Sequence, residues 1–271
     1  MTSPSAHAAT SPRHTAARAL LHVDNVSRVF GGLRAVSDFS MSVNVGDLVG
    51  LIGPNGAGKT TAFNLITGVY PPSSGHIYLG GKGIDGHAPM QINRAGVART
   101  FQNIRLFSNL SVLENVCVGF NRPVGQGLLR TIFRTPKFAR ESALAENEGL
   151  HLLRTLGLGN QCDLLAKNLP YGDQRRLEIA RALATRPRIL LLDEPAAGMN
   201  PQEKIELMKL IRFIRDSFGV GILLIEHDMR LVMTICEKIT VLDSGETIAI
   251  GSPAEIQENP KVIEAYLGEP A

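Results

Sequence analysis

The fold is decided by residues 48–61, Leu48-Val49-Gly50-Leu51-Ile52-Gly53-Pro54-Asn55-Gly56-Ala57-Gly58-Lys59-Thr60-Thr61. The first five residues form the continuous apolar run expected of a strand buried on both faces. The next eight fit the pattern G-x-x-x-x-G-K-[ST], and a helical segment follows to about Thr67, where Gly68 stops it. A strand, a glycine-rich turn and a helix in this order predict a phosphate-binding loop.

Each residue type in this loop has a chemical reason. Glycine allows backbone N–H groups to surround a phosphate without a Cβ clash, and the helix N-terminus adds its positive end. Lys59 can reach the β- and γ-phosphates, and the Thr60 hydroxyl can ligate Mg²⁺. The alternative, a glycine-rich turn without a ligand, is disfavoured by the strand–turn–helix context. The candidate nucleotide-binding residues are Gly53, Pro54, Asn55, Gly56, Ala57, Gly58, Lys59, Thr60 and Thr61.

An acidic doublet, Asp193-Glu194, follows a second apolar run, Ile189 to Leu192. Open α/β sheets bind ligands at the carboxyl ends of their strands, so we expect the doublet beside the phosphate loop. There Asp193 would hold Mg²⁺, directly or through water, and Glu194 would act on the attacking water as general base or as its orienting group. The alternative is an ordinary acidic turn after a core strand.

A histidine occupies a comparable position after a third apolar run. Residues 223–225 are followed by Glu226-His227-Asp228, and a histidine at a strand end can approach a γ-phosphate and sense it. A lone histidine is more often structural, so His227 carries this reading only together with the phosphate loop. Gln102, in Thr100-Phe101-Gln102, carries no signal by itself.

Composition excludes several classes of protein. The chain has 271 residues, of which 44% are hydrophobic and 20% charged, as in globular proteins of one or two domains. The net charge of +3 is too small to indicate a nucleic-acid partner. The apolar run 220–225 is far shorter than the ~18 residues of a membrane span. Cys117, Cys162 and Cys236 lack metal-ligand or redox spacing, which indicates a reducing, cytoplasmic compartment.

The N-terminal half reads as a tail, short strands and then helices. Residues 1–20 predict a disordered tail, with an organelle transit peptide as the less favoured alternative. Residues 21–23, 26–29 and 41–45 predict short strands, and 90–170 predict mostly helix. Ser111 and Glu114 fit a capping box. The side chains expected on one buried face of a helix ending near Gly157 are Leu144, Leu152, Leu153 and Leu156.

The C-terminal half alternates strands and helices. Asn200 and Pro201 fit the N-cap and first position of a helix, and 221–225 predict another buried strand. Alternating units of this kind predict a parallel sheet covered on both faces by helices, closed by a hairpin turn at 243–245. Residues 121–140 are basic and rich in Gly and Pro. A solvated loop is favoured there over a contact with anionic lipid heads.

Together these motifs resemble the ATP-binding subunits of ABC transporters over about residues 21–267. The motifs occur along the chain in the same order as in that family. They are the phosphate loop, Thr100-Phe101-Gln102, Leu169-Pro170-Tyr171-Gly172-Asp173-Gln174, Asp193-Glu194 and His227. The resemblance implies an α/β fold, a P-loop NTPase of ABC ATPase type. Its mostly parallel sheet core carries an antiparallel β subdomain and a helical subdomain. The implied parts are 21–90 with 171–250 (core and antiparallel β subdomain), 91–170 (helical signature subdomain) and 251–271 (C-terminal helical extension).

The resemblance is narrower for the longer ATPase subunit of branched-chain amino acid importers, which also carries an insert like 121–140. The segments that carry it are Thr100 to Phe107, Tyr171 to Arg181, Glu194 to Pro201, Ile225 to Met229 and Ala265 to Glu269. The implied function is an ATP-hydrolysing subunit that powers such an importer, with ATP and Mg²⁺ as cofactors. Two ATPase subunits would stack head to tail and trap two ATP molecules.

The same resemblance implies roles for single residues. Phe30 matches the aromatic that stacks on adenine, and Gln102 the glutamine that reaches Mg²⁺ and the lytic water. His227 matches the γ-phosphate switch. Tyr171, Gly172 and Asp173 match the signature that faces the γ-phosphate bound by the other ATPase subunit, and Asn200 matches the loop at the dimer contact. Pro170 and Tyr171 replace the usual Ser and Gly, which removes one hydroxyl, and Asn200 replaces the usual Asp.

The implied partners are a second, shorter ATPase subunit, two transmembrane permease subunits and, indirectly, a periplasmic or extracellular solute-binding protein. A homodimer is the alternative to the heterodimer, and no nucleic acid is expected. The location implied is the cytoplasmic face of the inner membrane, as a peripheral subunit. Candidates for receiving the permease helices are Ile104, Leu106, Phe107 and Leu110, of which we expect at least half to pack inside the helical lobe.

Three other readings are less favoured. A lipopolysaccharide-extraction ATPase has similar motifs, but the segments at 100–102 and 195–198 favour the amino acid importer. A DNA-repair or chromosome ATPase would need long heptad arms between Lys59 and Asp193, and none are present. A translation-type relative would carry two phosphate loops, whereas this chain has one.

Overall fold

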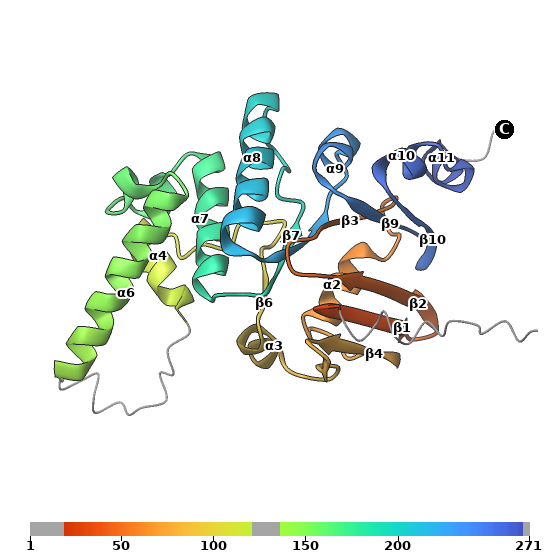
Figure 1. The fold of residues 1–271 in the computed structure, drawn as a ribbon, viewed down its shortest axis with the longest axis horizontal. Coiled ribbons are helices and arrows are strands. Elements are labelled where there is room, and N and C mark those ends of the chain that lie inside the picture. The colour runs from red at the N-terminus through yellow and green to blue at the C-terminus, as the bar shows by residue number, and fades with distance from the viewer. Residues whose placement is uncertain (1–18, 121–135, 268–271) are drawn as a thin grey trace, which may run out of the picture.

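The computed structural model describes residues 19–120 and 136–267 (Figure 1). The predicted tail 1–20 lies outside the described residues up to position 18. Most of the basic insert, 121–135, and the last four residues, 268–271, also lie outside them.

A six-stranded sheet forms the centre of the molecule, in the order β10-β9-β3-β8-β7-β6. All neighbouring strands are parallel except the β9–β10 hairpin. The three strands that carry the predicted apolar runs, β3, β7 and β8, are buried along their whole length. The strands are β3 (Leu48–Ile52), β6 (Val97–Arg99), β7 (Ile189–Asp193), β8 (Gly221–Ile225), β9 (Lys238–Asp243) and β10 (Glu246–Gly251).

A second, antiparallel sheet has the order β2-β1-β4-β5. Its strands are β1 (Leu21–Phe30), β2 (Leu33–Val43), β4 (Ser74–Leu79) and β5 (Lys82–Gly83). The two short strands predicted at 21–23 and 26–29 are the single strand β1. Asn25 has a φ of 46°, and the register shifts between Val23 and Val26. This β-bulge breaks the alternation of apolar residues that the prediction relied on.

The prediction that helices cover both faces of the parallel sheet holds for one face and is incomplete for the other, which helices share with the antiparallel sheet. Helices pack on one face, against side chains such as Leu190 and Leu224. The alternate residues, such as Leu191 and Ile225, point to the other face, where they pack with α2 and the antiparallel sheet. The antiparallel strands have an apolar face of their own, and this second core buries it. The helices of the first face are α4 (Val112–Gly119), α6 (Pro136–Thr155), α7 (Tyr171–Ala184), α8 (Pro201–Phe218) and α9 (Met229–Ile235), whereas α2 is Lys59–Ile66.

Helices and the loops between them make up the described part of residues 90–170, apart from the edge strand β6, whose three residues are too few to show a pattern. The remaining elements there are α3 (Pro89–Ala95) and the short 3₁₀ helices η1 (Gly159–Gln161) and η2 (Ala166–Asn168). The capping box is confirmed, because Ser111 Oγ accepts from Glu114 N at 3.1 Å and Glu114 Oε2 accepts from Ser111 N at 2.7 Å. Leu144 is 57% exposed, and its neighbour Ala145 takes the buried position instead.

The C-terminal elements close the sheet at the β10 edge (Figure 1). Helices α10 (Pro253–Gln257) and α11 (Pro260–Leu267) place Ile256 and Val262 in the core on the helical face. The predicted hairpin turn between β9 and β10 is confirmed. Among the described residues, none of the helices combines the length and apolar character needed to span a bilayer.

Candidate active site

The phosphate loop joins the end of β3 to the start of α2, and it lies too close to its neighbours for side chains at two positions. A Cβ on Gly53, whose φ is +151°, would lie 2.0 Å from Leu242 O. A Cβ on Gly58, whose φ is +100°, would lie 2.6 Å from Ala35 O. Glycine is therefore required at both positions by packing as well as by backbone conformation.

Backbone hydrogen bonds fasten the loop to the antiparallel sheet and to the final hairpin. Gly245 N donates to Ala57 O at 3.1 Å, and Ser37 N donates to Gly245 O at 2.8 Å. The β9–β10 turn thus links β2 to the phosphate loop, although these segments are far apart in the sequence.

Lys59 lies inside the loop, with 7% of its surface exposed. Its ammonium group donates to Gly53 O and Pro54 O, both at 2.8 Å. Burial lowers the pKa of Lys59, and the negative charges of Glu194 and Asp193 oppose that shift. The lysine and the acidic doublet therefore belong to one electrostatic site.

A cavity of about 420 Å³ lies at the loop. Residues Gly56 to Thr61, the turn residues Leu33 to Ala35, and Ser244 line it. Phe30 is outside this lining, at the end of β1. Its ring meets Tyr70 edge-on at 5.1 Å, and the Arg28 guanidinium lies 4.6 Å from its centre.

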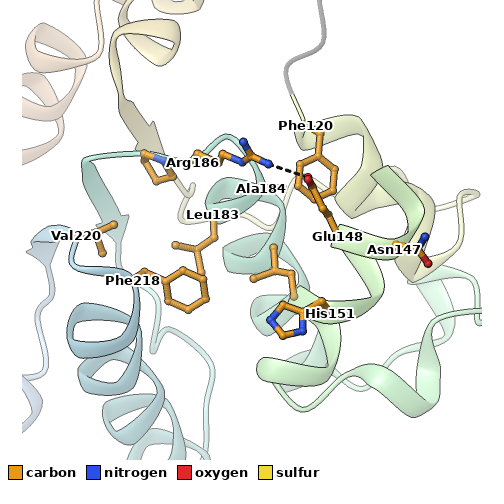
Figure 2. Close-up of a pocket in the computed structure, with 11 residues that line it drawn as sticks. Phe120, Asn147, Glu148, His151, Leu183, Ala184, Arg186, Phe218 and Val220 are labelled. Carbon is orange, nitrogen blue, oxygen red and sulfur yellow. Dashed lines mark hydrogen bonds and ion pairs between the residues drawn. The ribbon is translucent and has the colours of Figure 1, made fainter. Parts of the chain in front are cut away.

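A larger cavity, of about 700 Å³, lies between α6 and the C-terminal ends of α7 and α8 (Figure 2). Its lining is mostly apolar, and the Arg186–Glu148 ion pair at 2.9 Å is part of it. None of the predicted site residues lines this cavity, so its position gives no support for nucleotide binding there.

The side chains of Gln102 and His227 approach the same carboxylate oxygen of Glu194. Gln102 Nε2 donates to Glu194 Oε2 at 2.7 Å, and His227 Nδ1 lies 3.6 Å from the same oxygen. Gln102, Glu194 and His227 follow β6, β7 and β8, three neighbouring parallel strands whose carboxyl ends lie on the same side of the sheet. Glu194 has a φ of 46°, and its N–H donates to Ile225 O at 2.9 Å. Such a conformation persists only where its surroundings hold it.

Asp193 has a partner that sequence analysis missed. Arg99 Nη2 lies 2.6 Å from Asp193 Oδ2, and both side chains are nearly buried. Arg99 also donates from Nη1 to Asn64 Oδ1 at 2.7 Å, so it links α2 to the acidic doublet. In the sequence, Arg99 stands out only as a charged residue directly before Thr100-Phe101-Gln102, and the prediction did not use it.

A buried ion pair in α7 holds the segment that carries Gln102. Arg175 and Glu178 are fully buried and 2.7 Å apart. Arg175 donates to Phe101 O at 2.7 Å and to Gln102 O at 2.8 Å, and Glu178 accepts from Arg105 N at 3.3 Å. The signature helix therefore positions the loop after β6. Neither residue was singled out from the sequence.

The signature residues begin α7. Tyr171 Oη donates to Ala197 O at 3.0 Å, and Asp173 Oδ2 accepts from Gln161 Nε2 at 3.1 Å. Gly172 lies beside Glu203, and Pro170 caps the helix without a side-chain hydrogen bond. In the described part of the chain, no hydrogen bond or ion pair joins residues 171–173 to the phosphate loop. The two motifs also begin helices on opposite faces of the sheet.

Comparison with known proteins agrees with this geometry. The sequence model described as ABC transporter matches residues 36–197. The one described as branched-chain amino acid ATP-binding cassette transporter matches 246–271. The first of two similar relatives is the high-affinity branched-chain amino acid transport ATP-binding protein LivG of Salmonella typhimurium, 48% identical, covering 92% of this chain and 98% of the relative. The second, BraF of Pseudomonas aeruginosa, has the same description; it is 47% identical, covering 93% and 99%.

More distant relatives share the family. The lipopolysaccharide export system ATP-binding protein LptB of Escherichia coli is 35% identical, covering 93% of this chain and 98% of its own. Among solved structures, the ADP conformation of MJ1267, an ATP-binding cassette of an ABC transporter, superposes with a TM-score of 0.80. It is 32% identical and covers 93% of this chain and 99% of that one. The chain therefore belongs to the ABC transporter family, as one of its ATP-binding and ATP-hydrolysing subunits.

Proposed function

We propose that this chain powers an importer for branched-chain amino acids from the cytoplasmic face of the inner membrane. The support is the 47–48% identity to ATP-binding proteins described for that transport, over nearly their whole length, together with the match at 246–271. The observation that carries the catalytic part is the approach of Gln102 and His227 to the carboxylate of Glu194, whose charge also acts on Lys59.

The proposed mechanism starts from the phosphate loop. Backbone N–H groups between Asn55 and Thr61 surround the phosphates, and Lys59 exchanges its two carbonyl partners for phosphate oxygens. Glu194 takes or orients the proton of the attacking water, Gln102 fixes the water's position, and His227 contacts the γ-phosphate. Lys59 is only 7% exposed, so little water reaches it and electrostatic interactions are stronger there.

The donors available for a metal ion are oxygen atoms, which suit Mg²⁺. We assign Thr60, Gln102 and Asp193 as the residues that would hold it, with Asp193 acting through water while Arg99 occupies one of its oxygens. Mg²⁺ would neutralise phosphate charge that develops during hydrolysis. Adenine stacking by Phe30 is part of the same proposal, and an exposed ring next to Tyr70 and Arg28 is compatible with it.

A second ATPase subunit would complete each site. The signature and the phosphate loop of one chain begin helices on opposite faces of the sheet, so Tyr171, Gly172 and Asp173 are available to a neighbouring chain. These residues form the N-terminus of α7, and a helix N-terminus is a favourable site for an anion such as a phosphate. We propose a heterodimer with a shorter ATPase subunit, with the homodimer as the alternative.

Two permease subunits would bind near Gln102 and would link this chain indirectly to an external solute-binding protein. Phe107 is 48% exposed and lies under the Arg181 guanidinium at 5.4 Å. Ile104 and Leu110 are half-buried, and Leu106 packs against the core on the helical face. An exposed aromatic residue close to the catalytic glutamine is suited to pass motion between the site and a membrane subunit.

Transport and co-purification test the proposal together. We expect deletion of the gene to lower leucine uptake and the parent chain, but not Lys59→Ala, to restore it. The chain should co-purify from membranes with two multispanning proteins and a second ATPase. Recovery with a lipopolysaccharide-export complex would favour the second candidate, which rests on the 35% identity to LptB. Recovery with DNA would overturn both.

A further inference from the structure

Glu226 is a buried acid that the mechanism above does not use. It is the first residue after β8, and none of its surface is exposed. Its Oε1 accepts from Ala196 N at 2.7 Å, and its Oε2 accepts from His227 N at 3.2 Å. The amide of Asp228 also faces the carboxylate. In the described ranges, neither lysine nor arginine forms an ion pair with Glu226.

Placing a carboxylate in such a position is unfavourable. A charge taken out of water without a cation must be satisfied by hydrogen bonds or else take up a proton. Burial raises the pKa of Glu226, while the three amides and the charge of His227 oppose the shift. Because an apolar residue would fill the space at lower cost, the carboxylate calls for an explanation in what it connects.

The carboxylate connects two catalytic segments. Ala196 is two residues after Glu194, so β8 holds this segment at both ends: Ile225 O accepts from Glu194 N at 2.9 Å, and Glu226 accepts from Ala196 N. Glu194 is in the left-handed region, with a φ of 46°. The two anchors from consecutive residues keep it in this strained conformation.

The same carboxylate faces the imidazole ring of His227. Nδ1 of His227 lies 3.9 Å from Glu226 Oε2 and 3.6 Å from Glu194 Oε2. Two carboxylate oxygens near one ring nitrogen favour a proton on that nitrogen and orient the ring. The second nitrogen, Nε2, then remains for a ligand.

We propose that Glu226 is a positioning residue for ATP hydrolysis, which holds the segment Glu194 to Ala196 and the ring of His227 in one fixed arrangement. The inference rests on the proposed roles of Glu194 and His227. Within the described residues, Glu226 forms no hydrogen bond or ion pair with the phosphate loop or with Gln102, so it acts through its two neighbours.

The chemistry predicts an order of replacements. The two oxygens of Glu226 serve amides from two segments, and glutamine offers only one acceptor. The NH₂ group of Glu226→Gln would meet a backbone N–H and leave one segment unanchored. Glu226→Asp keeps both acceptors and the charge but shortens the side chain by one methylene. The turnover rate should therefore fall from Glu to Asp to Gln.

The experiment compares the full-length Glu226→Gln, Glu226→Asp and control Glu258→Gln proteins. Glu258 is an exposed acid at the end of α10. Steady-state ATPase rates give kcat, the fluorescent analogue MANT-ATP gives the dissociation constant, and thermal unfolding reports folding. Histidine labelled with ¹⁵N, with His227→Gln to assign the signal, reports which ring nitrogen carries the proton.

We expect Glu226→Gln to lower kcat about 10- to 100-fold, because a small misplacement of catalytic groups has that effect. MANT-ATP affinity should stay within about twofold, since the phosphate loop is untouched. Glu226→Asp should recover part of the rate, and the proton should move from Nδ1 of His227 toward Nε2 in Glu226→Gln. Should Glu226→Gln not fold, Glu226→Asp with lowered kcat and parent affinity carries the same support.

The proposal is overturned if Glu226→Gln, or Glu226→Asp where only that variant folds, hydrolyses ATP with the kcat of the parent protein. So does a loss of affinity, stability and rate in equal measure, because that pattern belongs to a purely structural residue. The proposed function has its own test: an active Glu194→Gln overturns the assignment of Glu194. An inactive Glu194→Gln beside a fully active Glu226→Gln overturns only the role of Glu226.

Discussion

Glu194 is the residue on which the site converges. Its carboxylate accepts a hydrogen bond from Gln102 and lies near His227, and its charge acts on Lys59. Its backbone is held in the left-handed region by Ile225. A side chain so placed can accept a proton from a neighbouring water.

Glu194→Gln separates binding from chemistry. Glutamine keeps the size of the side chain but cannot take a proton, so we expect ATPase turnover to fall at least about 100-fold. MANT-ATP binding should stay within about twofold, because Lys59 and the loop amides are unchanged. ATP should then stabilise the closed pair of subunits, which size-exclusion chromatography detects. The matched control is Glu258→Gln, and turnover at the parent rate would show that Glu194 is not the catalytic acid–base group.

Cys236 gives a pH-dependent prediction. Burial raises the pKa of its thiol to about 12, from an ordinary value of 9.0. The folded protein keeps the proton between these two pH values while the unfolded chain releases it, so stability falls as pH rises through this window. The slope should reach about 1.4 kcal/mol per pH unit. Urea unfolding from pH 8 to 10.5 measures it, and Cys236→Ala should remove this contribution; an unchanged slope in that variant would count against it.

The sequence points to candidate site residues where they lie within one recognisable motif or directly after an apolar strand. Lys59, Asp193, Glu194 and His227 belong to this group. Arg99 and Glu226 were missed, because their roles depend on pairs that form only when distant segments meet, such as Arg99 with Asp193 across two strands. No local pattern marks such a pair before the strand order is known.

Helix α8 illustrates how one element aims the catalytic loop. Asn200 caps it by accepting from Glu203 N at 3.0 Å, Glu203 reaches back to Asn200 N at 2.8 Å, and Pro201 takes the first position. The cap fixes where the loop that begins at Glu194 ends and the helix starts. The replacement of the family's usual Asp by Asn therefore leaves the capping geometry intact.

Asn200→Ala removes one side of this cap. We expect the free energy of unfolding to drop by about 1 kcal/mol, the typical value of an N-cap hydrogen bond. Asn200→Asp should be neutral or slightly stabilising, because it keeps the acceptor and adds a negative charge at the helix N-terminus. Urea denaturation of the three proteins measures both effects. An Asn200→Ala protein as stable as Asn200→Asp would show that the cap contributes nothing.

At the scale of elements, prediction succeeded where the hydrophobic pattern was long and unbroken. The strands β3, β7 and β8 are continuous apolar runs and appear where they were expected. The pattern failed at β1, where the bulge at Asn25 shifts the alternation, and at β6, which has only three residues. It also failed to show which face the antiparallel sheet would cover, because that depends on packing between sheets.

In the whole molecule, the phosphate loop lies where the two hydrophobic cores meet. The helices on one face carry the signature, and α2 with the antiparallel sheet covers the other. The sheet edge between them collects Gln102, Glu194 and His227 from three strands. A rigid sheet that connects both layers allows a change at the phosphate to reach the helical layer, where Arg175 holds the backbone of Gln102.

The C-terminal extension also reaches the phosphate loop. Val262 anchors α11 in the core, and the phenol of Tyr266, one turn later, faces the amide of Gly53. Burial raises the pKa of Tyr266, and the amide of Gly53 opposes the shift. The last described helix therefore contacts the first residue of the loop, although more than two hundred residues separate them in the sequence.

Tyr266→Phe tests whether this contact matters for the nucleotide. The ring and its packing remain, and only the hydroxyl group is lost, so we expect MANT-ATP to bind about two- to tenfold more weakly, as for one hydrogen bond. The kcat at saturating ATP should change little, because Glu194 and Gln102 are not involved. Ile263→Ala, an exposed position on the same helix, is the matched control. Equal affinity in Tyr266→Phe and the parent would mean that the loop holds its conformation without the C-terminal helix.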